Sequence, residues 1–209
     1  TFRFLSVFKW EKRKGWDVLL QAFFEEFSEE DPVELIVKTQ TFRDEDFHMQ
    51  ASEFASSLAS AKRPLAQYQI SDQNLSPSDL PRLYMAADAF VLPTRGEGWG
   101  RPIVEAMSMG LPVIATNWSG PTEFMSEQNA LLLEIEGLSD VIGGEPTHRW
   151  AEPSLPHLKR LMRWVVEHRE EAIELGERAR EEMVARFSPE VVMRNHVLPQ
   201  LQRIATSLA

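Results

Sequence analysis

The chain has 209 residues, 43% of them hydrophobic, and its 22 lysines and arginines against 32 aspartates and glutamates give a formal net charge of −10. This balance fits a globular protein with a sizeable core and argues against a nucleic-acid partner or a basic membrane patch. The absence of cysteine excludes disulfide bonds and thiolate catalysis.

The sequence shows neither a membrane span nor a targeting signal. No apolar stretch reaches the roughly 18 residues that a transmembrane helix needs, and the first residues lack a signal-peptide pattern. We therefore expect no transmembrane segment and a cytoplasmic location, which includes the cytosolic face of a membrane. Thr1 leads directly into an apolar run without an initiator Met, so we also expect the chain to be a piece of a longer protein.

The first part of the chain alternates apolar runs with amphipathic stretches. Residues 2–8 (FRFLSVF) predict a buried strand, KWEKRKG a basic loop, and residues 16–27 a helix, because apolar residues recur there at helical spacing. Residues 33–39 predict a second strand, residues 44–60 a surface helix, and residues 66–72 a third strand.

The same alternation continues toward the C-terminus. Residues 76–88 predict a helix entered through Ser and Pro, and the apolar strand AFVLPT follows at residues 89–94. The next helix is predicted from Pro102 to Gly110, where glycine ends it. The remaining predicted elements are strands at 111–116 and 130–134, a short helix at 119–126, and helices only from about residue 154 onward, with a break near 168–171 and a last helix after Ser188 and Pro189.

Strands that alternate with helices favour a parallel sheet covered on both faces. We therefore expect an α/β fold with a doubly wound, Rossmann-like parallel sheet and extra C-terminal helices. No repeat, low-complexity linker or second core pattern appears, so we expect a single domain over residues 1–209. In such a sheet, ligands bind at the carboxyl ends of the strands, where loops lead into helices.

The loop after the first strand is rich in cations. Lys9, Lys12, Arg13 and Lys14 all lie close to a predicted helix start. Lysine side chains and the N-terminus of a helix both favour a bound phosphate. The same stretch also fits a solvated basic loop without a ligand.

The second notable loop is RGEGWGRPIVEAMSMG, residues 95–110. Its three alternate glycines allow a ligand to approach the backbone closely, and the helix predicted from Pro102 directs its positive end at the same space. We expect Glu97 and Glu105 to face one pocket there. Carboxylates repel phosphates, so they favour hydroxyl groups, and a ligand that combines phosphates with hydroxyls is a nucleotide sugar.

The two loops, in this order and each after a strand, resemble GT-B glycosyltransferases, specifically the C-terminal, donor-binding half of family 4, the glycosyl transferases group 1. FKWEKRKGWDVLLQAF resembles the first loop and helix of that family, and Glu97 and Glu105, with seven residues between them, resemble its donor-binding motif. The resemblance covers essentially the whole chain. It implies a partner domain, the N-terminal GT-B domain, which this chain lacks.

The resemblance also implies roles for particular residues. Lys14 and Lys9 would contact the donor diphosphate and stabilise the leaving nucleotide, and Glu97 would contact the donor sugar, which makes Lys14 and Glu97 the implied catalytic residues. Glu105 would bind the ribose hydroxyls. The other implied donor-binding residues are Gly98, Trp99, Gly100, Arg101, Ser119 and Gly120. An aromatic residue such as Trp99 serves equally well to line a sugar pocket or to pack the loop.

By the same resemblance, the reaction would be a retaining, metal-independent transfer of a hexosyl group from a nucleotide-diphosphate sugar, with no cofactor, to an unidentified saccharide, lipid or protein. The chain alone would bind the donor without transferring the sugar. Phe8, Lys9 and Ser119 stand where the family has Gly, Arg and Gly. These departures keep a second hypothesis open: a non-catalytic nucleotide-binding or protein-interaction module that kept the fold.

Two further motifs carry less weight. Asp44-Glu45-Asp46 matches the D-x-D pattern of metal-dependent transferases, but it stands at a predicted helix start, where acidic residues are favourable without a metal. No histidine or further acid is spaced to complete a ligand set, so we expect no metal site. A dinucleotide-dependent oxidoreductase is disfavoured because Arg101 occupies the third glycine position of G-x-G-x-x-G.

Overall fold

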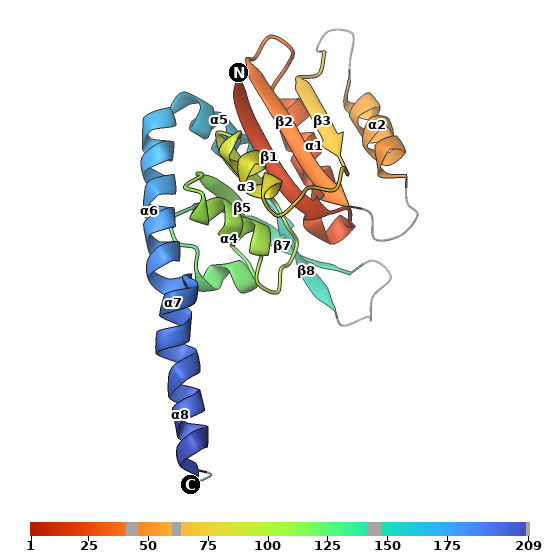
Figure 1. Cartoon of the computed structure of the whole chain (residues 1–209). Coiled ribbons are helices and arrows are strands. Elements are labelled where there is room, and N and C mark those ends of the chain that lie inside the picture. Colours follow the sequence, from red (N-terminus) through yellow and green to blue (C-terminus); the bar gives the residue numbers. More distant parts are fainter. Residues whose placement is uncertain (41–45, 60–63, 142–147, 208–209) are drawn as a thin grey trace.

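The computed structural model describes residues 1–40, 46–59, 64–141 and 148–207. Its centre is a six-stranded, fully parallel sheet with the strand order β3-β2-β1-β4-β5-β6 (Figure 1). The strands are β1 (Phe2–Lys9), β2 (Val33–Gln40), β3 (Gln67–Ser71), β4 (Ala89–Leu92), β5 (Val113–Thr116) and β6 (Leu131–Leu133). This order is that of a doubly wound, Rossmann-like fold, as predicted.

Helices connect the strands and cover the sheet. They are α1 (Trp16–Glu26), α2 (Phe47–Leu58), α3 (Asp79–Met85), α4 (Arg101–Ser108), α5 (Leu155–Glu167) and α6 (Arg169–Phe187), with 3₁₀ turns η1 (Lys12–Lys14) and η2 (Gly120–Glu123). Helix α1 contacts α2 and α5, whereas α4 contacts α6. All four residues of β4 and of β5 are buried, which requires cover on both faces of the central strands.

Most predicted elements occur within a few residues of their expected bounds. The helix expected from Pro102 begins one residue earlier at Arg101, and Gly110 takes the left-handed conformation (φ 78°) just past its end. The break near residues 168–171 lies at His168, between α5 and α6. The short helix expected at 119–126 is only the 3₁₀ turn η2. Ser119, the first residue of the expected helix, has a positive φ that an α-helix does not contain, so the turn begins only at Gly120.

An antiparallel hairpin follows the sixth strand, where the sequence pattern predicts no element. It consists of β7 (Ile135–Asp140) and β8 (Arg149–Pro153). Most side chains of β7 are exposed or half-buried, so the segment lacks the apolar run that marks a core strand. Figure 1 shows the hairpin beyond the carboxyl ends of the parallel strands.

The C-terminal segment runs away from the sheet. Helix α7 (Pro189–Val192), a π-helical turn (η3, Met193–Val197) and α8 (Leu198–Ser207) form one rod that projects from the end of α6 (Figure 1). Apolar side chains on this rod are exposed: Met193, Leu198, Leu201 and Ile204. Among the helices of the described residues, none is long and apolar enough to cross a membrane.

Candidate functional site

The candidate site lies where the strand order of the sheet reverses, between β1 and β4. Both strands end at the same edge, and the loops that follow them touch: the backbone N–H of Arg95 donates to the carbonyl of Arg13 at 2.7 Å, and the Thr94 hydroxyl donates to the same carbonyl at 3.1 Å. Ligands of doubly wound sheets bind at such a reversal point. The two loops singled out in the sequence therefore meet there.

Lys14 and Glu97, from these two loops, form a buried ion pair. The Lys14 Nζ lies 2.5 Å from Glu97 Oε1, and each residue is only 8% exposed. The next residue, Gly15, has φ +70°, and a Cβ at that position would lie 1.9 Å from the carbonyl oxygen of Pro93. Only glycine fits this contact, so the loop that carries Lys14 is held closely against the chain that follows β4.

Arg13 adds a second cation to this pair. Its Nη1 donates to the carbonyl of Gly96 at 2.6 Å and lies 3.7 Å from Glu97 Oε2. Its Nη2 also lies 3.0 Å from Glu11 Oε2. The basic loop thus brings two cations, Arg13 and Lys14, to one carboxylate, and the sequence had marked Arg13 only as one member of the basic run.

The glycine-rich loop contains glycines that packing does not require. Gly100, directly before α4, has φ +85°, a conformation that favours glycine. In contrast, a Cβ at Gly96 or Gly98 would have no neighbour within 4 Å, and neither residue has a φ in the left-handed region. Neither the backbone conformation nor the surrounding structure therefore explains Gly96 and Gly98, whereas close approach of a ligand would.

Glu105 lies on α4, one turn beyond the start of the helix. The Tyr84 hydroxyl donates to Glu105 Oε2 at 2.8 Å, and Arg101 Nη2 lies 3.6 Å from Oε1. Burial and the nearby carboxylate raise the pKa of Tyr84 far above its ordinary value, so Tyr84 remains a hydrogen-bond donor. The structure places Glu105 near the expected helix terminus but shows no direct contact between the described atoms of Glu105 and Glu97.

The turn at Ser119 and Gly120 packs against the backbone of Glu97. The Gly120 N–H and the Ser119 hydroxyl donate to the Glu97 carbonyl at 3.0 and 2.8 Å. A Cβ on Gly120 would lie 2.1 Å from the carbonyl oxygen of Gly98, so glycine is required there. Ser119 itself has φ 65° and ψ −148°, a region that is essentially reserved for glycine.

The remaining predicted donor-binding residues differ in exposure. Trp99 packs its ring against Phe124 and Phe187, with centroid distances of 5.1 and 5.6 Å, which anchors the glycine-rich loop to η2 and the end of α6. The Arg101 side chain is 85% exposed. Lys9 is exposed at the end of β1 and lines a cavity.

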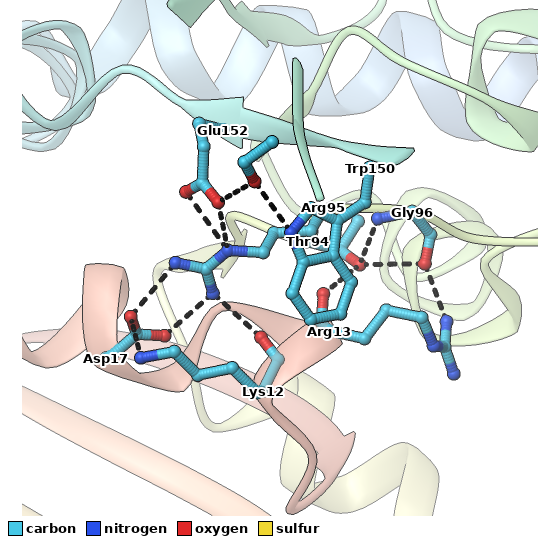
Figure 2. A network of polar contacts seen from close by, with 9 residues as sticks. Lys12, Arg13, Asp17, Thr94, Arg95, Gly96, Trp150 and Glu152 are labelled. Carbon is cyan, nitrogen blue, oxygen red and sulfur yellow. Dashed lines mark hydrogen bonds and ion pairs between the residues drawn. The ribbon is translucent and has the colours of Figure 1, made fainter. Parts of the chain in front are cut away.

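A buried arginine joins the basic loop to the hairpin (Figure 2). The Arg95 side chain donates to both carboxylate oxygens of Asp17 (2.8 and 3.0 Å), to both of Glu152 (3.0 Å each) and to the carbonyl of Lys12 (2.7 Å). Burial alone would raise the pKa of Asp17, but the hydrogen bonds from Arg95 and Lys12 outweigh it, and the pKa is lowered. Sequence reasoning missed Arg95 because its partners are distant in the chain.

The hairpin strand β8 is tied to the same residue through its backbone. The Ala151 N–H donates to the Arg95 carbonyl at 3.0 Å, and the Arg95 guanidinium lies 5.7 Å from the centroid of the Trp150 ring. Ser139 on β7 accepts from the Trp150 indole at 2.8 Å and donates to Glu152 at 2.6 Å. The unpredicted hairpin is therefore tied to the two loops of the candidate site through Arg95 (Figure 2).

Two neighbouring cavities lie along α4. One, of about 440 Å³, lies between the ends of β1 and β2 and the segment before α3, and reaches Lys9 and Pro102. The other, of about 290 Å³, is lined by Tyr84 and Glu105. Pro77 and Leu80 line both cavities. The two spaces together extend from the basic loop to the predicted ribose ligand.

The D-x-D motif lies partly outside the described residues, since Asp44 and Glu45 belong to residues 41–45. Asp46 caps α2, and its carboxylate accepts from the Met49 N–H at 3.0 Å. Within the described ranges, no group of three or more His, Cys, Asp and Glu side chains could hold a metal ion.

Comparison with known proteins places these features in a family. The family model described as Glycosyl transferases group 1 matches residues 1–142. Spore coat protein SA of Bacillus subtilis (strain 168) is 30% identical over 128 residues, which cover 59% of this chain and 32% of that protein. O-antigen chain mannosyltransferase B of Escherichia coli is 49% identical over 49 residues, or 23% of this chain and 13% of that protein. The chain thus spans a third or less of these curated relatives.

Solved structures confirm the predicted fold of a GT-B C-terminal domain. The C-terminal domain of a glycosyl transferase group 1 family protein (LpcC) from Francisella tularensis has a TM-score of 0.70 at 18% identity, with 90% of this chain and 87% of that chain covered. Anabaena HepE in complex with UDP and glucose also gives 0.70 at 21% identity, with 100% of this chain but 48% of HepE covered. The family match over residues 1–142 bears out the resemblance seen in the two loops, and the chain belongs to the glycosyl transferases group 1 family.

Proposed function

We propose that this chain is the donor-binding half of a glycosyltransferase that transfers a hexosyl group from a nucleotide-diphosphate sugar, retains the configuration at the sugar and uses neither metal nor cofactor. The observation that carries the proposal is the meeting of Lys14, Arg13 and Glu97 beside Gly96 and Gly98, two glycines that the fold does not require. Cations and an open backbone at a helix N-terminus suit a diphosphate. Two of the related proteins support the same class of donor: HepE forms a complex with UDP and glucose, and O-antigen chain mannosyltransferase B is a mannosyltransferase.

The two cavities suggest how the donor lies. With the diphosphate at Lys9, Arg13 and Lys14, the nucleoside extends into the cavity of about 440 Å³ next to Lys9, and Glu105 accepts hydrogen bonds from the ribose hydroxyls in the adjoining cavity. Tyr84 fixes one oxygen of Glu105, and the other oxygen, which lies 3.6 Å from Arg101 Nη2, accepts from the ribose. The sugar then lies beside Glu97 and the open glycines.

The proposed chemistry follows from this placement. The bond between the sugar C1 and the diphosphate oxygen breaks, and the nucleoside diphosphate leaves with the electron pair. Lys14 and Arg13 stabilise the charge that develops on the leaving group. An acceptor hydroxyl forms the new bond to C1 and transfers its proton to an oxygen of the departing diphosphate. We propose that a domain outside this chain binds the acceptor, a saccharide, lipid or protein, and that the 209-residue chain alone binds the donor without transferring the sugar.

Calorimetric titration with UDP, GDP and ADP tests the site. We expect at least one of them to bind, and both Lys14→Ala and Glu105→Ala to weaken that binding by on the order of tenfold, because each removes a charged partner of the ligand. Lys159→Ala, which removes a half-buried lysine on α5 that pairs with Glu25, and Glu177→Ala, on the exposed side of α6, are the matched controls. Unchanged affinity in both site variants would refute the assignment.

The second hypothesis, a non-catalytic module, makes a different prediction. Ser119 and Lys9, which replace the glycine and arginine of the family pattern, are the observations that favour it. Such a module would bind nucleotide, yet the protein that contains this chain together with the expected N-terminal domain would transfer no sugar. Measurement of sugar transfer by that longer protein separates the two.

A further inference from the structure

Lys38 is buried in a part of the molecule where a lysine needs a reason. It is the sixth residue of β2, is 8% exposed, and takes part in no ion pair among the described residues. Its Nζ donates one hydrogen bond, to the carbonyl of Thr39 at 2.7 Å. A lysine ammonium can donate three, and lysine is almost never buried unless it is paired.

The lysine lines the cavity of about 440 Å³ that adjoins the basic loop. Much of the wall is apolar, with contributions from Val7, Phe8, Leu75 and Leu80. Apolar walls with a few polar groups are the usual lining of a pocket for a flat organic ligand. Burial lowers the pKa of Lys38, and only the charge of Asp72 opposes that shift, so a hydrogen-bond acceptor inside the cavity would relieve an unfavourable burial.

The polar groups of this cavity determine which hydrogen-bonding groups a ligand must present. In addition to Lys38, the polar lining residues are Lys9, Thr39, Gln40 and Ser76, and the described lining contains no carboxylate. An ammonium group only donates, so it pairs with carbonyl oxygens and repels amino groups. Uracil, thymine and hypoxanthine or guanine present a carbonyl at position 4 or 6, where cytosine and adenine present an amino group.

We propose that Lys38 makes this pocket selective for oxo bases, by donating a hydrogen bond to the carbonyl at position 4 of a pyrimidine or position 6 of a purine. The inference rests on the proposed function, because it takes the cavity to be the nucleoside pocket. It adds the class of base and the residue that recognises it. A contact of this kind discriminates between bases by on the order of tenfold.

Two pairs of nucleotides compare the oxo and the amino form of one base edge. UDP and CDP carry an oxygen or an amino group at position 4, with N3 protonated only in uracil, and IDP and ADP differ in the same way at position 6 and N1. Calorimetry on the 209-residue chain should give about tenfold tighter binding of the oxo member in at least one pair. In Lys38→Met, which keeps the length of the side chain and removes its donors, this ratio should fall to near one. Lys159→Met is the matched control, and thermal melting verifies that each variant is folded.

Other outcomes identify the error. If Lys38→Met weakens all four nucleotides and inorganic pyrophosphate by the same factor, Lys38 is a phosphate ligand or a structural residue and the inference is wrong. If the oxo preference persists in Lys38→Met, another group recognises the base. If neither these four nucleotides nor GDP binds the wild-type chain, the proposed function fails first, and the inference fails with it. If GDP alone binds, the proposed function stands, and the loss of GDP binding in Lys38→Met then tests the inference.

Discussion

The Arg95 network offers a sharp test of how the site is assembled. Arg95→Met removes five hydrogen bonds from a side chain that is 5% exposed, and leaves the carboxylates of Asp17 and Glu152 without their shared cation. Breaking a buried ion pair costs about 3–5 kcal/mol. We expect the lower end, about 3 kcal/mol, because Asp17 retains Lys12 at 2.6 Å and the Glu152 side chain is 36% exposed.

Urea denaturation followed by circular dichroism measures this loss. Arg82→Met is the control, because its partner Asp79 lies at 3.3 Å on the surface and the Arg82 side chain is 78% exposed, so its loss should cost less than about 0.5 kcal/mol. The loss of stability in Arg95→Lys should lie between those of Arg95→Met and Arg82→Met, since lysine keeps the positive charge but lacks the planar guanidinium that binds both carboxylates. A loss below about 1 kcal/mol for Arg95→Met, with an unchanged m-value, would refute the reasoning.

The effect of Arg95→Met should depend on pH in a defined direction. The pKa of Asp17 is lowered in the folded chain, because hydrogen bonds from Arg95 and Lys12 outweigh the burial that would raise it. Its contribution is therefore present above the unfolded pKa of about 3.9 and is lost as the pH falls through the lower folded value. The difference in stability between wild type and Arg95→Met should accordingly shrink below about pH 4. A difference that stays constant down to that range would show that Asp17 contributes little.

Three further predictions concern the site itself. Gly98→Ala should leave the melting temperature unchanged, because the added Cβ has no neighbour within 4 Å, yet it should weaken UDP or GDP binding by roughly tenfold. Gly120→Ala, in contrast, should lower the melting temperature, because the added Cβ would lie 2.1 Å from the carbonyl oxygen of Gly98. Unchanged nucleotide affinity in Gly98→Ala would remove the ligand explanation for this glycine. Ser119→Gly should be more stable to urea than Ser119→Ala by about 1–2 kcal/mol, the reverse of the usual order, since Ser119 has φ 65° and ψ −148°. Tyr84→Phe removes the donor at 2.8 Å from Glu105 and should weaken nucleotide binding several-fold in calorimetry, with little change in fold by circular dichroism. Equal nucleotide affinity in Tyr84→Phe would mean that Glu105 needs no such support.

The centre of the sheet was predictable because its middle strands must be buried on both faces. β4 and β5 have no exposed position, so their sequences are continuous apolar runs that stand out without any knowledge of their neighbours. The hairpin was not predictable, because its strands depend on contacts with a distant residue and not on an apolar run of their own. Its strands are stabilised by Arg95, whose carbonyl and guanidinium bind Ala151 and Glu152. Arg95 lies 57 residues before Glu152 in the chain. The sequence of residues 135–153 alone therefore contains no sign of this contact.

Some residues of the candidate site were likewise predictable from the local sequence, and others were not. Residues that depend on local geometry, such as the glycines before α4, are visible in the sequence because their type alone is informative. Residues whose role depends on which strands are neighbours in the sheet cannot be recognised in the sequence. Lys38 looks like an ordinary polar position at the end of a strand until β1 and the segment before α3 close a cavity around it.

Lys14 and Glu97 are 83 residues apart and were expected to serve different parts of one ligand. Their ion pair follows from the adjacency of β1 and β4, and it means that, without a ligand, the buried charge of each is balanced by the other. A diphosphate that binds Lys14 must therefore compete with Glu97 for this cation, while a sugar hydroxyl that donates to Glu97 compensates for the loss. Phosphate and sugar binding at this site are expected to support each other for that reason.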